Sequence, residues 1–197
     1  MKIIIVTGGI GAGKSVVCNE FKKLGAKVIG GDNVGHNCLK PEGLAYSDVV
    51  SEFGNEILNE DQTINRVKLG QLAFASRERL DKLNELTHKH ILKEIVEEVD
   101  RLNGCDIIVL EIPLFRADDI RNDGVISVVA DYDERIERVI ERSKIPRETI
   151  EKIMALQPSD EEYRNCADFC IENVGNVEDL RQKTREIYWE IEKNERM

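Results

Sequence analysis

A glycine-rich stretch near the start of the chain has residue types and spacing suited to phosphate chemistry. Residues 8–15 read Gly-Gly-Ile-Gly-Ala-Gly-Lys-Ser and fit the pattern G-x-x-x-x-G-K-[ST]. Glycines let the backbone N–H groups approach a phosphate closely. The N-terminus of a following helix adds about half a positive charge. Lys14 supplies a full charge, and the Ser15 hydroxyl is a hard oxygen ligand suited to Mg²⁺. This pattern predicts a triphosphate site.

The flanking sequence has the order that such a loop needs. Residues 2–7 read as a short buried strand, and residues 16–24 read as a helix with Val17, Phe21 and Leu24 on one face. The alternative is a glycine-rich turn that fits by chance, and at a glycine frequency of about 7% this would happen in roughly one per cent of chains of this length. The strand before and the helix after favour the functional interpretation.

The whole chain has the composition of a globular protein. With 197 residues it can form one sizeable core, with room for a small inserted subdomain. The net charge of −10 argues against a nucleic-acid-binding surface but not against an anionic ligand in a local positive pocket. No apolar run is long enough to span a membrane, and the N-terminus shows no signal peptide. We expect a cytoplasmic protein with neither nucleic acid nor membrane as partner.

The five cysteines do not form an evident framework. Their odd number and the lack of a Cys-x-x-Cys pair predict free thiols. Cys166 and Cys170 could be interpreted as a metal pair, but with three scattered histidines in the chain, core or surface thiols are favoured.

A carboxylate follows the second predicted strand. Residues 26–29 form that strand, and Asp32 follows a pair of glycines. A side chain just past the carboxyl end of a strand lies on the ligand-binding rim of an open α/β sheet. Asp32 is therefore a candidate for catalysis or for organising Mg²⁺. It could equally cap a helix that starts near residue 33, and position alone leaves both interpretations open.

Residues 33–105 show no strand alternation and predict a helical insertion. Apolar residues at helical spacing indicate helices near 44–53, 67–74 and 78–102. His88 and His90 fall in the last of these. Being two residues apart they point to different faces, so they do not form a metal pair.

The C-terminal half returns to alternating strands and helices. Strands are predicted at 106–111, 124–130 and 167–171, and Glu111 ends the first of them, where a Walker-B acid would lie. Helices follow from residue 133, from 148 to 156 and from Gly175-Asn176 onward, the last with Asp179 as part of a capping box. The break at 143–147 is flanked by arginines, namely Arg135, Arg138, Arg142 and Arg147. These suit a lid over phosphates, although charge on a solvated helix explains any single one.

The combined pattern is that of an α/β, three-layer P-loop fold. It has a five-stranded parallel sheet, a helical acceptor-binding insertion at about 33–104 and a small lid at about 138–150, within a single domain whose core is 1–32 and 105–197. Along nearly its whole length the chain resembles the dephospho-CoA kinase family. The resemblance is carried by these pieces: Thr7 to Ser15, Val28-Ile29 with Asp32, Phe53-Gly54 with Ile57-Leu58, Arg66 before Leu69 and Phe74, Leu83 to His88, Ile112 to Leu114, Arg138 and Arg142 with Arg147-Glu148, Gln157, and Ala167 to Phe169 through Asn173 and Gly175.

The resemblance implies transfer of the ATP γ-phosphoryl group to the ribose 3′-hydroxyl of dephospho-CoA, with Mg²⁺ supplied with ATP. It implies catalytic roles for Lys14, Asp32 and Arg142, with Ser15 and, through water, Asp32 near Mg²⁺. The implied ATP-binding residues are Gly9, Ile10, Gly11, Ala12, Gly13, Lys14, Ser15, Val16, Arg138, Asn173, Gly175 and Asn176. The implied acceptor-side residues are Asp32, Arg66, His88, Pro113 and Leu114.

The chain departs from the family pattern at a few positions, most of them on the acceptor side. Gly30 stands where the family has the first Asp of Asp-x-Asp, Lys89 follows His88 in place of Pro, and Glu111 replaces Asp. The alternatives are therefore a related kinase acting on a nucleoside monophosphate, or a nucleotide-binding switch without efficient transfer. We expect a monomer or a small homo-oligomer.

Overall fold

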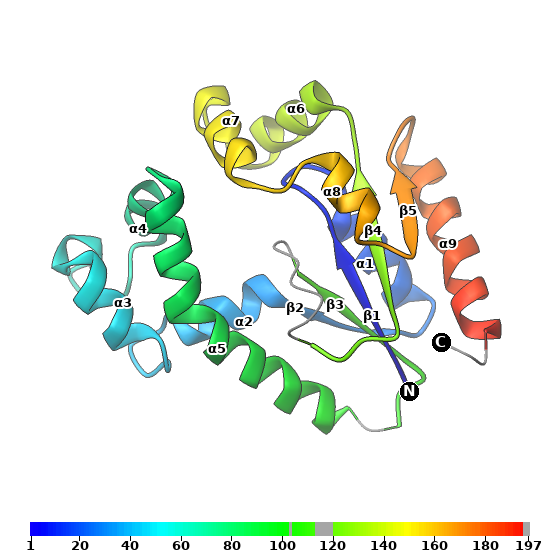
Figure 1. Cartoon of the computed structure of the whole chain (residues 1–197), viewed down its shortest axis with the longest axis horizontal. Coiled ribbons are helices and arrows are strands. Elements are labelled where there is room, and N and C mark those ends of the chain that lie inside the picture. Colours follow the sequence, from blue (N-terminus) through cyan, green and yellow to red (C-terminus); the bar gives the residue numbers. More distant parts are fainter. Residues whose placement is uncertain (103, 113–119, 195–197) are drawn as a thin grey trace. The chain divides into compact units, whose positions relative to one another are not determined.

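The computed structural model describes residues 1–102, 104–112 and 120–194 (Figure 1). Within these residues, five strands form one parallel sheet. They are β1 (Lys2–Thr7), β2 (Lys27–Gly30), β3 (Ile107–Glu111), β4 (Gly124–Val129) and β5 (Phe169–Glu172), in the order β2-β3-β1-β4-β5. This arrangement confirms the predicted α/β class and parallel sheet.

The chain separates into two compact units, one of residues 1–30 and 99–197 and one of residues 31–98. The first unit contains the sheet and the helices α1 (Lys14–Lys23), α6 (Tyr132–Ser143), α7 (Arg147–Leu156), α8 (Asp160–Asn165) and α9 (Val177–Lys193). The second contains α2 (Gly31–Cys38), α3 (Tyr46–Phe53), the 3₁₀ turn η1 (Asn55–Ile57), α4 (Arg66–Ala73) and most of α5 (Arg77–Arg101). The helical insertion thus begins and ends a few residues earlier than predicted.

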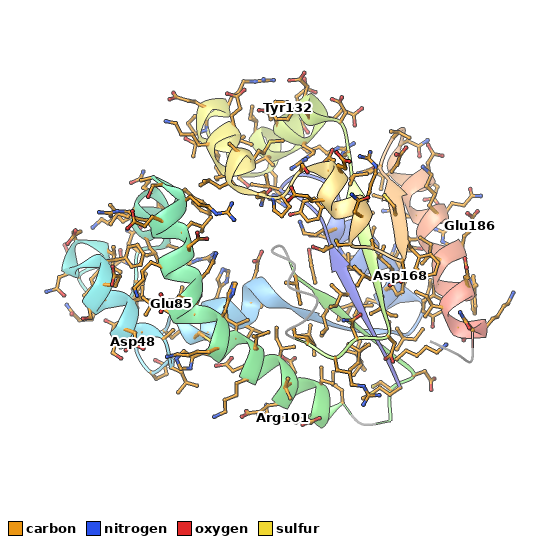
Figure 2. The ribbon with its side chains drawn as sticks, in the orientation of Figure 1. Asp48, Glu85, Arg101, Tyr132, Asp168 and Glu186 are labelled. Carbon is orange, nitrogen blue, oxygen red and sulfur yellow. The ribbon has the colours of Figure 1, made fainter. Side chains whose placement is uncertain are left out.

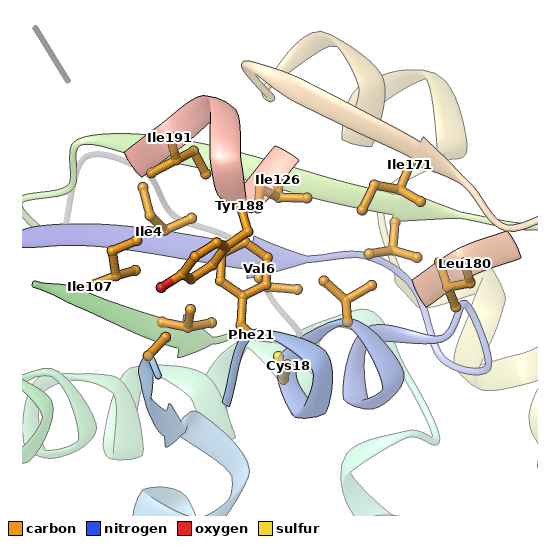
Figure 3. Close-up of a cluster of buried hydrophobic side chains, with 14 of the residues drawn as sticks. Ile4, Val6, Cys18, Phe21, Ile107, Ile126, Ile171, Leu180, Tyr188 and Ile191 are labelled. Carbon is orange, nitrogen blue, oxygen red and sulfur yellow. The ribbon is translucent and has the colours of Figure 1, made fainter. Parts of the chain in front are cut away.

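The core of the first unit lies between the sheet and the pair α1 and α9 (Figure 3). Ile4 and Val6 of β1, which are fully buried, face this layer because alternate strand residues point to one side of a sheet. Phe21 of α1 and Tyr188 of α9 pack edge to face, with ring centroids 5.5 Å apart. Tyr188 also donates a hydrogen bond from its hydroxyl to the Leu24 carbonyl at 2.7 Å, which ties α9 to the end of α1.

A buried carboxylate adds a polar link between the same two helices. Glu20 of α1 is 4% exposed and accepts hydrogen bonds from Arg185 of α9 at 2.8 Å and from Lys23 at 3.0 Å. These contacts hold the pKa of Glu20 below its ordinary value, with the Arg185 bond as the largest cause. Because α1 begins directly at the phosphate-binding loop, its fixation also fixes that loop.

Three local features differ from what the sequence predicted. Helix α2 begins at Gly31, so Asp32 lies in its first turn and is not the residue that caps a helix starting at 33. Helix α8 was not predicted, although the pair Ser159 and Glu162 forms a complete capping box at its start. The last strand runs from Phe169 to Glu172, so it starts two residues later and ends one residue later than predicted. Asp168, just before it, accepts a hydrogen bond from the Val125 N–H at 2.8 Å and joins β5 to β4 (Figure 2).

Among the described residues, no helix is both long enough and apolar enough to cross a lipid bilayer.

Candidate active site

The loop between β1 and α1 adopts a conformation with positive φ at three glycines, Gly8, Gly11 and Gly13. Gly11 has φ 76° and Gly13 has φ 110°, both in the left-handed region. A Cβ on Gly13 would also lie 2.5 Å from the Asn173 amide nitrogen. Gly13 is the N-cap residue of α1, so the loop passes directly into the helix with its first N–H groups unpaired within the helix.

The side chain of Lys14 folds back over this loop. Its ammonium nitrogen donates to the carbonyls of Gly8 at 2.8 Å and Gly9 at 3.0 Å. The lysine charge therefore lies at the mouth of the loop, where a triphosphate can exchange its own oxygens for these two carbonyls.

Side chains from the C-terminal half of the first unit hold the outer side of the loop. Gln157 accepts from the Ile10 N–H at 2.8 Å, and Arg135 donates from Nε to the Ile10 carbonyl at 2.9 Å. Asn173, which is buried, donates from its amide to the Ala12 carbonyl at 2.8 Å. In a trans peptide the carbonyl and the next N–H point in opposite directions. Carbonyls held outward therefore turn the N–H groups of the following glycines toward the ligand side.

The side-chain amides of Asn173 and Asn176 form hydrogen bonds within the protein, so neither is assigned to direct recognition of the base. The Asn173 amide is used within the protein, and the Asn176 side chain accepts from the N–H groups of Glu178 and Asp179. Gly175 between them has φ 91°. This segment can therefore present backbone groups and the exposed apolar side chains of Val174 and Val177 to a base. Sequence reasoning did not single out these two valines.

Two hard oxygen ligands suited to Mg²⁺ lie next to each other beside the loop, on Ser15 and Glu111. Ser15 donates a hydrogen bond from its hydroxyl to Glu111 Oε1 at 3.1 Å. A hydroxyl and a carboxylate beside a phosphate loop fit Mg²⁺, which takes oxygen ligands and retains several waters. Among the described residues, no group of three or more His, Cys, Asp or Glu side chains gathers as a metal site.

Cys18 lies beneath this pair as a neutral thiol. Burial and the neighbouring Glu111 carboxylate raise its pKa far above the ordinary value. The thiolate is the nucleophilic form of cysteine, so Cys18 is a packing residue here.

The predicted lid arginines fall into two groups. Arg138 donates to Glu134 at 2.6 Å and reaches the Gly11 carbonyl at 3.5 Å, while Arg142 is exposed and contacts Ser143 at 3.4 Å. Arg135, one turn earlier on α6, is buried and bound to the loop and to Asp160. Arg135 is thus not a free lid charge, and the sequence analysis had not separated it from the other arginines. Lys144, with φ 53°, is the C-cap residue that follows α6, and the chain then turns into α7.

The acceptor-side candidates lie on three helices of the second unit. Asp32 is exposed in the first turn of α2, Arg66 is the first residue of α4, and His88 lies within α5. Arg66 NH1 is 3.3 Å from Nδ1 of His36, which the sequence analysis had not named. Burial and the Arg66 charge lower the pKa of His36, while Asp32 opposes the shift. Pro113 and Leu114 lie outside the described residues.

The second unit also has a cavity of about 990 Å³, lined by residues at the end of α3 and the start of α5. Its walls are mostly charged, and they include none of Asp32, Arg66 and His88. We therefore do not assign the acceptor to it.

The phosphate loop fixes the class of ligand, and comparison with known proteins supplies the family. The family model described as dephospho-CoA kinase matches residues 2–179. The chain belongs to the dephospho-CoA kinase family. It is 37% identical to the dephospho-CoA kinase of Carboxydothermus hydrogenoformans over 188 residues, which cover 93% of this chain and 91% of that protein. It is 35% identical to the dephospho-CoA kinase of Aquifex aeolicus, over 97% of this chain and 98% of that protein.

Solved structures agree with this membership of the dephospho-CoA kinase family. The protein TT1252 from Thermus thermophilus has a TM-score of 0.78 at 29% identity, covering 96% of this chain and 97% of its own. Dephospho-CoA kinase from Campylobacter jejuni has a TM-score of 0.62 at 28% identity, covering 98% of both chains. A shikimate kinase from Acinetobacter baumannii, with a TM-score of 0.54 at 17% identity and coverage of 98% of this chain and 96% of its own, shares the fold. The chain is an ATP-dependent kinase of this family.

Proposed function

We propose that this chain transfers the γ-phosphoryl group of ATP to the 3′-hydroxyl of the dephospho-CoA ribose, giving CoA and ADP. The family match along residues 2–179 carries the proposal. The geometry of the loop at residues 8–15 supports the donor half of the reaction, because it combines a lysine charge, a helix N-terminus and outward-held carbonyls.

In this proposal residues 9–16 bind the phosphates. Their inward N–H groups bind the β-phosphate, and Lys14 leaves the Gly8 and Gly9 carbonyls to neutralise charge on the β- and γ-phosphates. Ser15 and Glu111 would hold Mg²⁺, with Asp32 contributing through water, and the ion when bound would supply neutralisation of charge on the phosphate oxygens. Val174 and Val177 would pack on the base beside Gly175 and Asn176.

Asp32 would orient the acceptor hydroxyl and take its proton as the oxygen attacks the γ-phosphorus. The new O–P bond forms as the bond from the γ-phosphorus to the bridging oxygen breaks, and ADP leaves with that electron pair. Arg66 and His88, with Pro113 and Leu114, would bind the acceptor, whose pyrophosphate suits a cationic side chain. Arg142, with Arg138, would approach the phosphates when the segment at about 138–150 closes over the nucleotide, and an arginine in this position can contribute about 10³–10⁵ in rate. Closure would also exclude water, which would otherwise compete as acceptor.

We also propose that the protein acts in the cytoplasm on small molecules, as a monomer or a small homo-oligomer, without nucleic acid or membrane as partner. The net charge of −10 supports the absence of a general nucleic-acid surface.

The test is a purified-protein assay with ATP and Mg²⁺, in which dephospho-CoA and a panel of nucleoside monophosphates are offered separately. We expect turnover of dephospho-CoA with phosphate on the ribose 3′-oxygen, located by ³¹P NMR of the product. Turnover of a monophosphate alone would favour the related kinase. ATP binding without transfer to any acceptor would favour the switch. The kinase alternative retains support from the departures Gly30 and Lys89 on the acceptor side.

A further inference from the structure

We propose that Arg135 is a positioning residue that holds the phosphate-binding loop in its ligand-ready form from behind. The inference rests on the donor site of the proposed function and not on the identity of the acceptor. Arg135 is 5% exposed and lies on α6, far along the chain from the loop that it contacts.

The contacts of Arg135 connect three segments of the first unit. Nε donates to the Ile10 carbonyl at 2.9 Å, and NH1 pairs with Asp160 Oδ1 at 2.9 Å at the start of α8. Gln157, which precedes α8, binds the N–H of the same Ile10 at 2.8 Å. Both polar groups of Ile10 are therefore held by side chains from the segment that follows β4, and the orientation of this one residue is determined by two independent contacts.

The position of Arg135 also explains why residue 9 is a glycine, which its backbone conformation does not explain. Gly9 is absent from the residues with positive φ, yet a Cβ built on it would lie 2.0 Å from NH2 of Arg135. On the next glycine of the loop, Gly11, a Cβ would lie 2.4 Å from the backbone carbonyl oxygen of Arg135. The loop and Arg135 are thus in close contact at both places, and Gly9 is small because the guanidinium occupies the space beside it.

The consequence for ligand binding follows from peptide geometry. Because the Ile10 carbonyl points to Arg135, the N–H of Gly11 in the same peptide points the other way. Asn173 does the same for the next such peptide, through the Ala12 carbonyl and the Gly13 N–H. Without Arg135 the peptide between Ile10 and Gly11 can rotate, since Gly11 tolerates a wide range of φ angles, and an N–H would no longer be preorganised for phosphate.

The buried positive charge of Arg135 is tolerated at this position because Asp160 pairs with it. Burying an unpaired guanidinium is costly, and the carboxylate at 2.9 Å offsets that cost. Arginine can serve both partners because its N–H groups point in fixed, divergent directions, whereas lysine has one nitrogen for both. The pair therefore couples the start of α8 to the loop.

The experiment compares the dissociation constants of ATP and of adenosine by calorimetry, without any acceptor present. We expect Arg135→Met to weaken ATP binding about 10- to 100-fold and adenosine binding less than 3-fold, because only ATP uses the loop. Arg135→Lys should fall between Arg135→Met and the unmodified chain. Arg164→Ala removes an exposed arginine that pairs with Glu172 at 3.3 Å, and it should leave both constants within 2-fold.

A second arm keeps the test decisive where Arg135→Met folds poorly. Gly9→Ala should weaken ATP binding in the natural chain. In an Arg135→Ala background, where the added methyl group has room, the loss of ATP affinity caused by Gly9→Ala should be at least 5-fold smaller.

Unchanged ATP affinity in folded Arg135→Met, or an equal loss of ATP affinity from Gly9→Ala in both backgrounds, would overturn the proposal. A lowered melting temperature with unchanged ATP affinity would make Arg135 structural only. Failure of the unmodified chain to phosphorylate dephospho-CoA would refute the proposed acceptor and leave this inference standing.

Discussion

The hydroxyl of Ser15 donates a hydrogen bond to Glu111 Oε1 at 3.1 Å. The first residue belongs to the first turn of α1 and the second ends β3, and they are 96 positions apart in sequence. The register explains their meeting. Val6, two residues before the loop, is the partner of Glu111 in the pairing of β1 with β3, so the loop leaves the sheet next to that carboxylate.

This pair predicts that Glu111 contributes to the Mg²⁺ requirement. Glu111→Gln keeps the shape and can still accept from Ser15, but it loses the charge that attracts a cation or its bound water. We expect the Mg²⁺ concentration for half-maximal rate to rise by about 10-fold or more, measured by titrating Mg²⁺ at fixed total ATP. Glu172→Gln, at the end of β5, is the control. An unchanged Mg²⁺ titration in Glu111→Gln would remove this residue from the metal site.

Asp32 is predicted to act chiefly on the acceptor, and only through water on the Mg²⁺ that accompanies ATP. Asp32→Asn keeps an oxygen that can accept a hydrogen bond from the hydroxyl but cannot take its proton. We expect kcat to fall by about 10²–10⁴ while the dissociation constant of ATP changes less than about 3-fold. Rapid-quench assays and calorimetry provide the two numbers. Asn33→Ala, the exposed neighbour in the same helical turn, is the control. Full activity of Asp32→Asn would reduce Asp32 to a surface residue of α2.

Glu20 is predicted to make stability depend on pH in the acid range. Its pKa is lowered in the folded protein, chiefly by the hydrogen bond from Arg185. A carboxyl group with a lowered folded-state pKa stabilises the protein above its unfolded value, here about 4.5, and this contribution is lost as the pH falls through the lower folded value. Glu20→Gln should cost about 1–3 kcal/mol at pH 7 and less at pH 3.

Urea unfolding at both pH values measures this difference for Glu20. Glu190→Gln, an exposed residue on α9, should change stability at neither pH. An equal loss at pH 7 and pH 3 in Glu20→Gln would show that shape, and not the charge of Glu20, matters at this site.

His36 is predicted to be neutral at pH 7 and to respond to Arg66. Burial lowers its pKa from the ordinary value of 6.5, and the Arg66 charge lowers it further. Folding therefore favours the neutral ring, so the contribution to stability is complete above about pH 6.5 and is lost as the pH falls toward the folded-state pKa. Arg66→Ala should raise the His36 pKa toward 6.5, because only the burial contribution would remain alongside Asp32.

The measurement is an NMR titration of the His36 ring protons in the natural chain and in Arg66→Ala. Lys68→Ala, an exposed cation on the same helix, is the matched control and should leave the His36 pKa in place. An identical His36 titration in Arg66→Ala and the natural chain would mean that the two side chains do not interact in solution.

The strand, glycine loop and helix around residues 8–15 were largely predictable from sequence because their signals are local. Residues 8–15 bring glycines, Lys14 and Ser15 together within a single turn of chain, and the flanking strand and helix are read from short-range hydrophobic patterns. The same reasoning found the five strands and the helical insertion. It missed α8, which is only six residues long, and misplaced the start of α2 relative to Asp32, because short helices carry little periodic signal.

What the sequence by itself determined is the phosphate loop, the α/β class and the family resemblance through motifs of fixed spacing. Only the tertiary structure decided the strand order β2-β3-β1-β4-β5, which places Glu111 beside the loop. It also separated Arg135, buried against Ile10 and Asp160, from the exposed Arg142, which lies about two turns further along α6. The two arginines have the same chemistry and similar local sequence. Their difference comes from contacts with residues distant in the chain, and no local pattern encodes which turn of α6 packs against the loop.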